Sequence, residues 1–254
     1  MENNEKQLVE VAMLAGEILL VSGAEIFRIE ETIHYILSGF GRDAESIVFS
    51  TGIFITVKGE DARSDTLVKR VVERSTNLHR IYLVNMVSRR LCDGSLTIAE
   101  AYKKLEEIKQ ARQYSLIGKE VSYISVALFF CVLLQGSFLE CICAGLVGGI
   151  LGVVVELAKY FRLNDFCINV LGASAAGIMA LIINNYIFLQ INSDLLIISA
   201  IMSLVPGVAF TTAVRDILNG DYSAGVARMM EAVVTAFAVA VGVGVGIALF
   251  TRLV

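Results

Sequence analysis

The chain has 254 residues, of which 56% are hydrophobic, together with 46 charged side chains, a net charge of −4 and a single proline. Residues 1–120 carry 34 of the charges, whereas residues 121–254 carry only 12 and contain several apolar runs of about 20 residues, the length that crosses a membrane. This composition excludes a purely soluble enzyme, a disordered protein and a disulfide-stapled secreted domain, and it argues against a nucleic-acid binder.

The first part of the chain begins with two helical patterns and one strand pattern. Apolar residues at helical spacing predict an amphipathic helix over residues 5–22, which Gly23 ends, and a second helix over residues 26–40. From Glu45 to Lys58 the apolar period changes to two, which predicts a strand or a hairpin that turns near Gly52.

The remaining elements of this part are shorter. We predict a helix over residues 65–76, a strand over residues 80–84 and a helix over residues 85–91. Thr97 then caps a helix that runs to Lys109, and Glu100 completes its capping box. These elements predict a cytoplasmic α+β domain over residues 1–112, which leads directly into a transmembrane domain over residues 113–254.

Five apolar segments of the second part predict an α-helical transmembrane bundle of five helices. They run roughly from Glu120 to Gln135, Phe138 to Leu157, Phe166 to Leu189, Leu195 to Val214 and Met229 to Phe250. Glycines four residues apart in the second segment favour close helix packing, either within the bundle or between subunits. Gly242, Gly244 and Gly246 alternate with valine, which we interpret as a thin, deformable stretch of the last helix.

Basic residues in the short loops indicate the orientation. With residues 1–115 inside, the inner loops carry Lys159, Arg162, Arg215 and Arg228, whereas the outer side carries only Arg252. The first residues also lack the basic and apolar pattern of a cleavable signal peptide. We therefore expect a multi-pass protein of the cytoplasmic membrane with its N-terminus in the cytoplasm and its C-terminus outside.

Polar groups gather around the only proline, in the fourth apolar segment. Pro206 removes a backbone donor and Gly207 adds flexibility, so we expect a broken helix of the kind that exposes backbone dipoles in secondary transporters. Within the next turns follow Thr211, Thr212, Arg215 and Asp216. An arginine can clamp a carboxylate, hydroxyls can orient it, and an acid can carry a coupled proton. The alternative is a proline-kinked packing helix in which Arg215 is an inner-side anchor.

Polar residues elsewhere complete the set of candidates. Glu231 at the start of the fifth segment and Asn169 in the third join the hypothetical substrate or proton path. The cytoplasmic motif supplies Gly23, Arg28 and Glu31, for which solvated ion pairing is the alternative interpretation. His34 and His79 are solitary, and the sequence holds no nucleophile and base pair or phosphate-binding motif, so we expect no catalytic residue, metal or cofactor.

Two motifs carry a family resemblance. Ser22-Gly-Ala-Glu-Ile-Phe-Arg-Ile-Glu-Glu-Thr32 resembles the entry motif of the threonine/serine exporter family. The later family signature is similar to the run from Leu204 through Arg228, continuing to Glu231 and Ala232. The resemblance implies a bacterial inner-membrane exporter of small amino acids or small organic acids that is driven by an ion gradient.

The chain departs from the family pattern in its length. Single-chain members have around ten spans in two related halves, whereas five are predicted here, so this chain resembles the N-terminal component of two-component exporters. The resemblance then implies a second small integral membrane subunit, with a homo-oligomer as another possibility, and dicarboxylates such as succinate as well as threonine and serine as substrates. A membrane-anchored metabolite-sensing or regulatory protein is the alternative function, and an enzyme is disfavoured.

Overall fold

The computed structural model describes residues 3–58, 64–72, 75–111, 114–187 and 191–253. By its contacts the chain forms two units, one of residues 1–111 and 207–230 and one of residues 112–206 and 231–254. Residues 207–230 thus pack with the N-terminal residues rather than with the segment before them. The division of the chain at residue 112 stays a prediction, and we describe each unit by itself.

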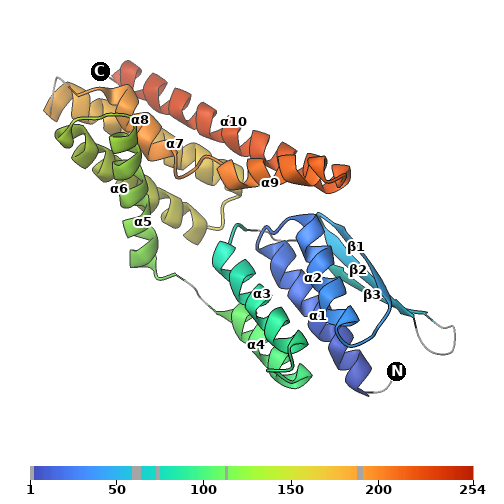
Figure 1. The fold of residues 1–254 in the computed structure, drawn as a ribbon. Coiled ribbons are helices and arrows are strands. Elements are labelled where there is room, and N and C mark those ends of the chain that lie inside the picture. The colour runs from blue at the N-terminus through green and yellow to red at the C-terminus, as the bar shows by residue number, and fades with distance from the viewer. Residues whose placement is uncertain (1–2, 59–63, 73–74, 112–113, 188–190, 254) are drawn as a thin grey trace. The chain divides into compact units, whose positions relative to one another are not determined.

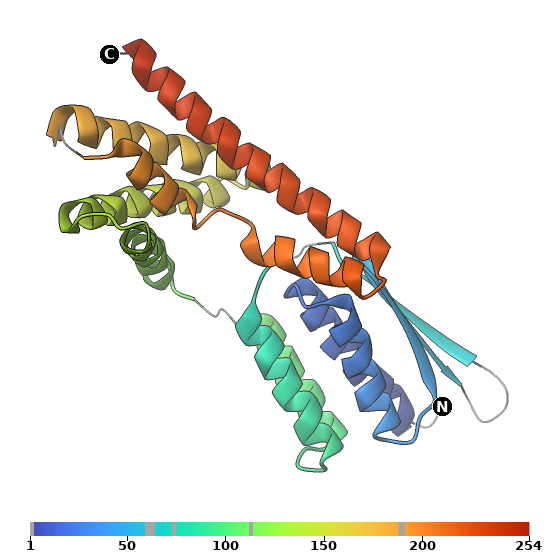
Figure 2. The same cartoon turned by 45° about the horizontal axis from the view of Figure 1, so that its top comes forward.

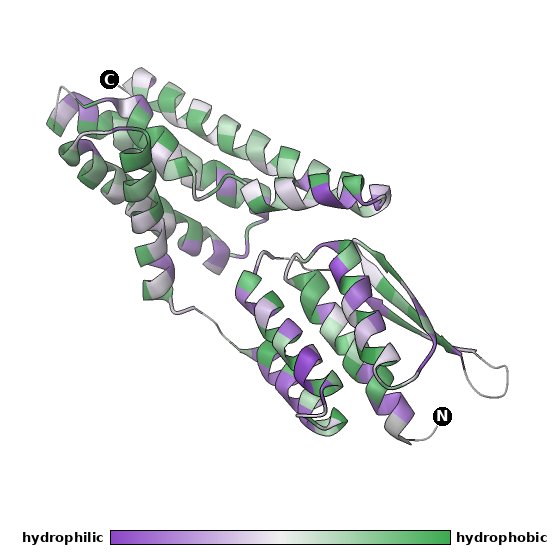
Figure 3. Cartoon of the chain, viewed as in Figure 1, coloured by the Kyte–Doolittle hydropathy of each residue, from purple (hydrophilic) through white to green (hydrophobic). Residues whose placement is uncertain are grey.

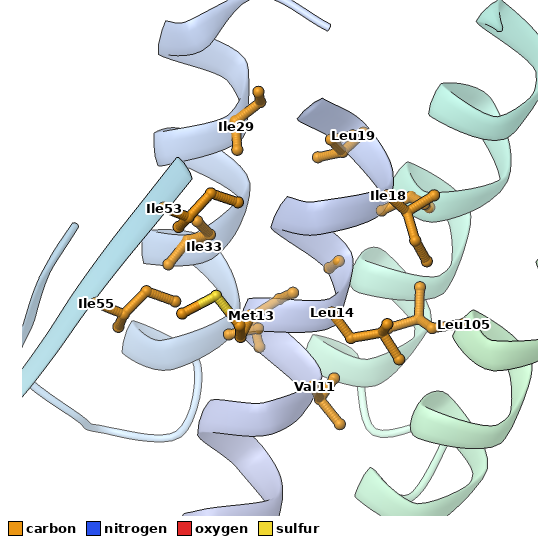
Figure 4. Packing of buried hydrophobic residues seen from close by; sticks show 14 of the residues in the cluster. Val11, Met13, Leu14, Ile18, Leu19, Ile29, Ile33, Ile53, Ile55 and Leu105 are labelled. Carbon is orange, nitrogen blue, oxygen red and sulfur yellow. The ribbon is translucent and has the colours of Figure 1, made fainter. Parts of the chain in front are cut away.

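Helix α1 (Asn3–Val21) is the centre of the first unit. It packs against α2 (Ile26–Ser38) and the sheet on one side, and against α3 (Leu78–Cys92) and α4 (Ile98–Gln110) on the other, as Figures 1 and 2 show. In Figure 4, Ile53 and Ile55 of the sheet lie close to Ile33 of α2 and Met13 of α1. Leu105 of α4 closes the core from the opposite side.

A three-stranded antiparallel sheet of β1 (Ala44–Phe49), β2 (Gly52–Lys58) and β3 (Ser64–Arg70) covers α1 and α2. The strand β2 is central, and its residues Ile53, Ile55 and Val57 are buried, which is the period of two expected of a half-buried strand. Phe49 pairs with Gly52 across the turn between β1 and β2. The predicted hairpin near Gly52 is therefore confirmed.

The predictions of a helix over residues 65–76 and a strand over residues 80–84 were wrong, whereas the predicted helix over residues 85–91 is confirmed as part of a longer helix. Residues 73 and 74 lie outside the described residues. Residues 64–70 form β3 rather than a helix, because they pair residue by residue with β2 in an antiparallel register. Residues 78–92 form the single helix α3 rather than a strand followed by a helix. Val84, Val87 and Leu91 bury one face of it at helical spacing, and the side chain of Asn77 accepts a hydrogen bond from the Arg80 N–H at its start.

The second unit holds α5 (Leu116–Leu133), α6 (Phe138–Tyr160), α7 (Asp165–Ile182), a π-helical turn η1 (Ile183–Ile187) and α8 (Ser193–Ile201), together with α10 (Tyr222–Leu253) from residue 231 onward. Among the described residues, four helices are long and apolar enough to cross a membrane: Leu116–Leu133, Phe138–Tyr160, Asp165–Ile187 and Tyr222–Arg252. Figure 3 shows the apolar character of these helices beside the mixed surfaces of α1 to α4.

The predicted fourth span is interrupted. Helix α8 ends at Ile201, and α9 (Gly207–Leu218) begins directly after Pro206. The nine residues of α8 rise only about 13 Å, less than half of a hydrocarbon core of about 30 Å. Pro206 cannot donate a hydrogen bond and disfavours a helical residue before it, so the predicted break at this position is confirmed. The predicted count of five membrane helices is not confirmed within the described residues.

Candidate functional site

The two sequence motifs meet in the first unit, where α9 contacts the first turn of α2. Asp216 of α9 accepts a hydrogen bond from the backbone N–H of Ile26, with 3.0 Å between nitrogen and Oδ1. Ile26 is the first residue of α2, and the preceding Glu25 makes no side-chain capping bond. A carboxylate at a helix N-terminus satisfies an unpaired donor and interacts favourably with the helix dipole. Asp216 therefore caps α2 from 190 positions away in the sequence.

A buried ion pair fixes this cap. The Nη1 atom of Arg228 lies 3.0 Å from Oδ2 of Asp216, and the side chains are 6% and 0% exposed. Arg228 also donates through Nη2 to the carbonyl oxygen of Ala24, at 2.6 Å. Burial raises the pKa of Asp216 above its ordinary value, and the Arg228 guanidinium and the Ile26 N–H act in the opposite direction. The pair thus joins α9 and the start of α10 to the α1–α2 connection.

A second, exposed group of charges surrounds Glu25. Its carboxylate pairs with Arg215 of α9, and its Oε2 lies 3.6 Å from Nε of Arg28. Both arginine side chains are 58% exposed, whereas Glu25 is 15% exposed. Two guanidinium groups therefore face solvent around one carboxylate. Such an arrangement can bind an anionic group, because guanidinium forms charge-assisted hydrogen bonds with carboxylates.

Two glycines allow the chain to turn at this site. Gly23 has a φ of +80° between α1 and α2, and a side chain there would approach the Ser75 carbonyl oxygen at 3.1 Å. Gly220 has a φ of +97° between α9 and α10. Both values lie in the left-handed region that favours glycine. Gly225 then lets α10 lie directly on α9, because a Cβ there would be 3.0 Å from the Ala213 carbonyl oxygen.

The structure brings together Arg215, Asp216 and the motif around Gly23 and Arg28, but it does not gather every predicted residue at this place. The Thr211 hydroxyl donates to carbonyl oxygens of its own helix, those of Gly207 and Val208. Thr212 is half-buried on α9, and Glu31 is exposed on α2. Pro206, the half-buried Asn169 and the exposed Glu231 belong to the second unit.

Sequence reasoning missed two partners at this site. Arg228 was counted only among the basic residues of the inner loops, whereas it is the buried partner of Asp216. Glu25 was not singled out, although it pairs with both Arg28 and Arg215. An arginine in the first turns of an otherwise apolar helix, shortly after an aspartate and a glycine turn, was the available signal for the buried pair.

Comparisons with known proteins agree with these motifs. The family model for threonine/serine exporters matches residues 10–250. A Mycobacterium tuberculosis protein described as a "Probable threonine/serine exporter" is 20% identical over 231 residues, which cover 90% of this chain and 43% of that relative. The chain thus spans less than half of the length of this curated relative, and no solved structure gives a significant match. On the family match, which covers both motifs, the chain belongs to the threonine/serine exporter family.

Proposed function

We propose that this chain is a membrane subunit of a secondary exporter of small amino acids, such as threonine and serine, or of small dicarboxylates such as succinate. The family match and the four apolar helices support an exporter role for this multi-pass membrane protein. The exposed guanidinium groups of Arg215 and Arg28 carry the proposal for the substrate, since all of these solutes present a carboxylate.

The proposed assembly contains more than this chain. A second small integral membrane subunit, or further copies of the chain, would supply the rest of the transporter. The proposal follows the resemblance of the chain, through the motifs Ser22–Thr32 and Leu204–Arg228, to the N-terminal component of two-component exporters. We place the N-terminus in the cytoplasm and the C-terminus outside, because the basic residues of the short loops favour that orientation. The first unit then faces the cytoplasmic solute.

In the proposed binding step, the carboxylate of the substrate displaces Glu25 from Arg215. Glu25 presents to Arg215 the same chemical group as the substrate, so the exchange replaces one charge-assisted contact with another. Thr211 lies one helical turn before Arg215, and its hydroxyl oxygen can still accept a hydrogen bond from the substrate. Thr212 likewise lies one helical turn before Asp216. The break at Pro206 and Gly207 leaves α9 separate from α8.

The acids of the motif have different proposed roles. Asp216 is engaged by Ile26 and Arg228, so we assign it a positioning role that holds Arg215 beside the start of α2. Glu231 of α10 and Asn169 of α7 remain proposed polar groups of the substrate or proton path. Gly23 supports the site by allowing the turn into α2, and Arg28 assists Arg215.

Substitution of Arg215 tests the proposed site. In proteoliposomes that contain the chain, with and without a co-expressed partner subunit, Arg215→Ala is expected to lower the initial efflux of labelled substrate about tenfold or more at low substrate concentration. The reason is the loss of a charge-assisted hydrogen bond, which contributes roughly 1.5–3 kcal/mol. Arg215→Lys should retain part of the rate, because it keeps the charge but loses the bidentate fork.

Arg252→Ala is the matched control, since it removes an exposed cation outside both motifs. Labelled serine, threonine and succinate should be compared in the same vesicles. If Arg215→Ala and Glu231→Gln both transport at the wild-type rate, the site assignment is wrong. If the wild-type protein moves none of these solutes but binds one of them tightly, the metabolite sensor replaces the exporter as the function.

A further inference from the structure

A second group of charged residues lies within the second unit, between the start of α5 and the end of α6. Glu156 of α6 binds two lysines, one with each carboxylate oxygen. Nζ of Lys119 lies 2.9 Å from its Oε2, and Nζ of Lys159 lies 3.0 Å from its Oε1. The side chain of Glu156 is 17% exposed. Both lysines therefore form ion pairs with the same carboxylate, that of Glu156.

The neighbouring Glu120 occupies a notch that two glycines of α6 leave open. A Cβ at Gly152 would be 2.8 Å from Oε2 of Glu120, and a Cβ at Gly149 would be 3.5 Å from its Oε1. A side chain at residue 152 would therefore displace the Glu120 carboxyl group from this position. The ring of Tyr123 covers the rest of the notch, with its Cδ2 atom 2.7 Å from the same Gly152 position. The packing of α5 on α6 thus places the Glu120 carboxyl group against the backbone at Gly152 and the ring of Tyr123.

The charges around Glu120 leave it without a cation of its own. Glu120 lies near the like charge of Glu156 on α6 and near Tyr123 on α5. The other titratable groups of this cluster are Lys119 and Lys159, which pair with Glu156, and Asp165 of α7, near Lys159. Within the described part of the chain, no ion pair joins Glu120 to a lysine or arginine. Glu120 is half-buried and lies near the carboxylate of Glu156, so the uptake of a proton removes a repulsion between like charges.

The position of Glu120 near the start of α5 also gives protons from water access to its carboxyl group. It is four residues past the start of α5, and Glu156 is four residues before the end of α6. At 1.5 Å per residue, both lie about 6 Å from the same end of the helix pair. Glu120 therefore lies near one end of the apolar helix Leu116–Leu133, within reach of water at the membrane surface.

We propose that Glu120 is a proton-binding site through which the exporter is coupled to a proton gradient. In the binding step a proton from water forms an O–H bond with the Glu120 carboxylate and neutralises it, and in the release step the same bond breaks and the proton returns to water. The Lys119–Glu156–Lys159 group holds the helices in register during this cycle. The use of the proton rests on the proposed export function, whereas the binding of the proton does not.

Glu120→Gln tests this inference by two independent measurements. In proteoliposomes with an imposed pH gradient, the ratio of solute flux with the gradient to flux without it is expected to fall to about 1, because an amide cannot exchange a proton in this pH range. In infrared difference spectra of the purified protein between high and low pH, one protonated-carboxyl band is expected to disappear. Glu107→Gln, which replaces an exposed glutamate of α4, should change neither result.

The outcomes separate the two proposals. If wild-type protein shows no flux, the export function fails, and the infrared band still decides whether Glu120 binds a proton. If Glu120→Gln keeps both the band and the gradient dependence, or if only a sodium gradient drives flux, the inference is overturned. Should that variant not fold, Gly152→Ala keeps the acid but fills its notch. The midpoint of the band is then expected to move by about one pH unit or more, and an unchanged midpoint contradicts the inference.

Discussion

Asp216→Ala is expected to lower the free energy of unfolding of the first unit by about 3–5 kcal/mol, because it leaves the Arg228 guanidinium buried without its carboxylate. The cap on the Ile26 N–H is lost at the same time. Asp216→Asn should cost less, since its amide oxygen can still accept the hydrogen bond from Ile26. Denaturant unfolding of the purified full chain, followed by a probe in the α1–α2 region, measures these differences.

A matched control and a double-mutant cycle make this prediction specific. Asp43→Ala removes an aspartate of the same unit that pairs with Lys58 while 70% exposed, and its cost should be small, as for other surface ion pairs. Asp216→Ala combined with Arg228→Ala should be less destabilising than the sum of the single changes, because neither charge is then left alone. Additive effects of below about 1 kcal/mol each would show that the pair does not hold the unit together.

The Asp216–Arg228 pair joins the first turns of α10 to the first unit. The helix α10 is continuous from Tyr222 to Leu253, and its first turns belong to the first unit through Arg228 and the buried Ala224. Arg215 and Asp216 are consecutive in sequence, so one turn of α9 holds both the exposed contact with Glu25 and the buried pair with Arg228.

Local patterns predicted much of the fold. The division into a charged and an apolar part, the hairpin at Gly52 and the Thr97–Glu100 capping box depend on neighbouring residues only, and all three are present. Residues 65–76 were misassigned because Leu67 and Val71 fit a helix period as well as a strand, and only pairing with β2 decides between them. The run around Tyr82 favours a strand by composition, but the burial of Val84, Val87 and Leu91 at helical spacing overrides it.

The candidate site was predictable in part. Residue chemistry indicated Arg215, Asp216 and Arg28, because charged groups beside apolar segments are costly. Their pairing could not be predicted, because Asp216 binds the start of a helix 190 positions earlier and no local period records such a contact. The close approach of Glu120 to Gly152 was hidden for the same reason: the glycine spacing indicated close packing, but not which side chain would occupy the space.

The alternating glycines Gly242, Gly244 and Gly246 of α10 are not equivalent in the structure. A Cβ at Gly242 would be 2.5 Å from the Val170 carbonyl oxygen, and one at Gly246 would be 2.6 Å from that of Ser174. The side chain at residue 244 would meet nothing within 4 Å. The interpretation of all three as one deformable stretch was therefore incomplete, because Gly242 and Gly246 form the face that packs on α7. The Ser174 hydroxyl also donates to the Gly242 carbonyl oxygen at 2.8 Å.

Gly242→Val and Gly246→Val are each expected to lower the melting temperature of the detergent-purified protein by about 5 °C or more, since overpacking against backbone costs roughly 1–3 kcal/mol. The same change at residue 244 is the matched control, because it adds an identical side chain to the same helix where space is open. Gly244→Ala should be neutral or slightly stabilising, as alanine is the better helix former. Equal losses at residues 242, 244 and 246 would mean that helix flexibility, and not contact with α7, is what the glycines provide.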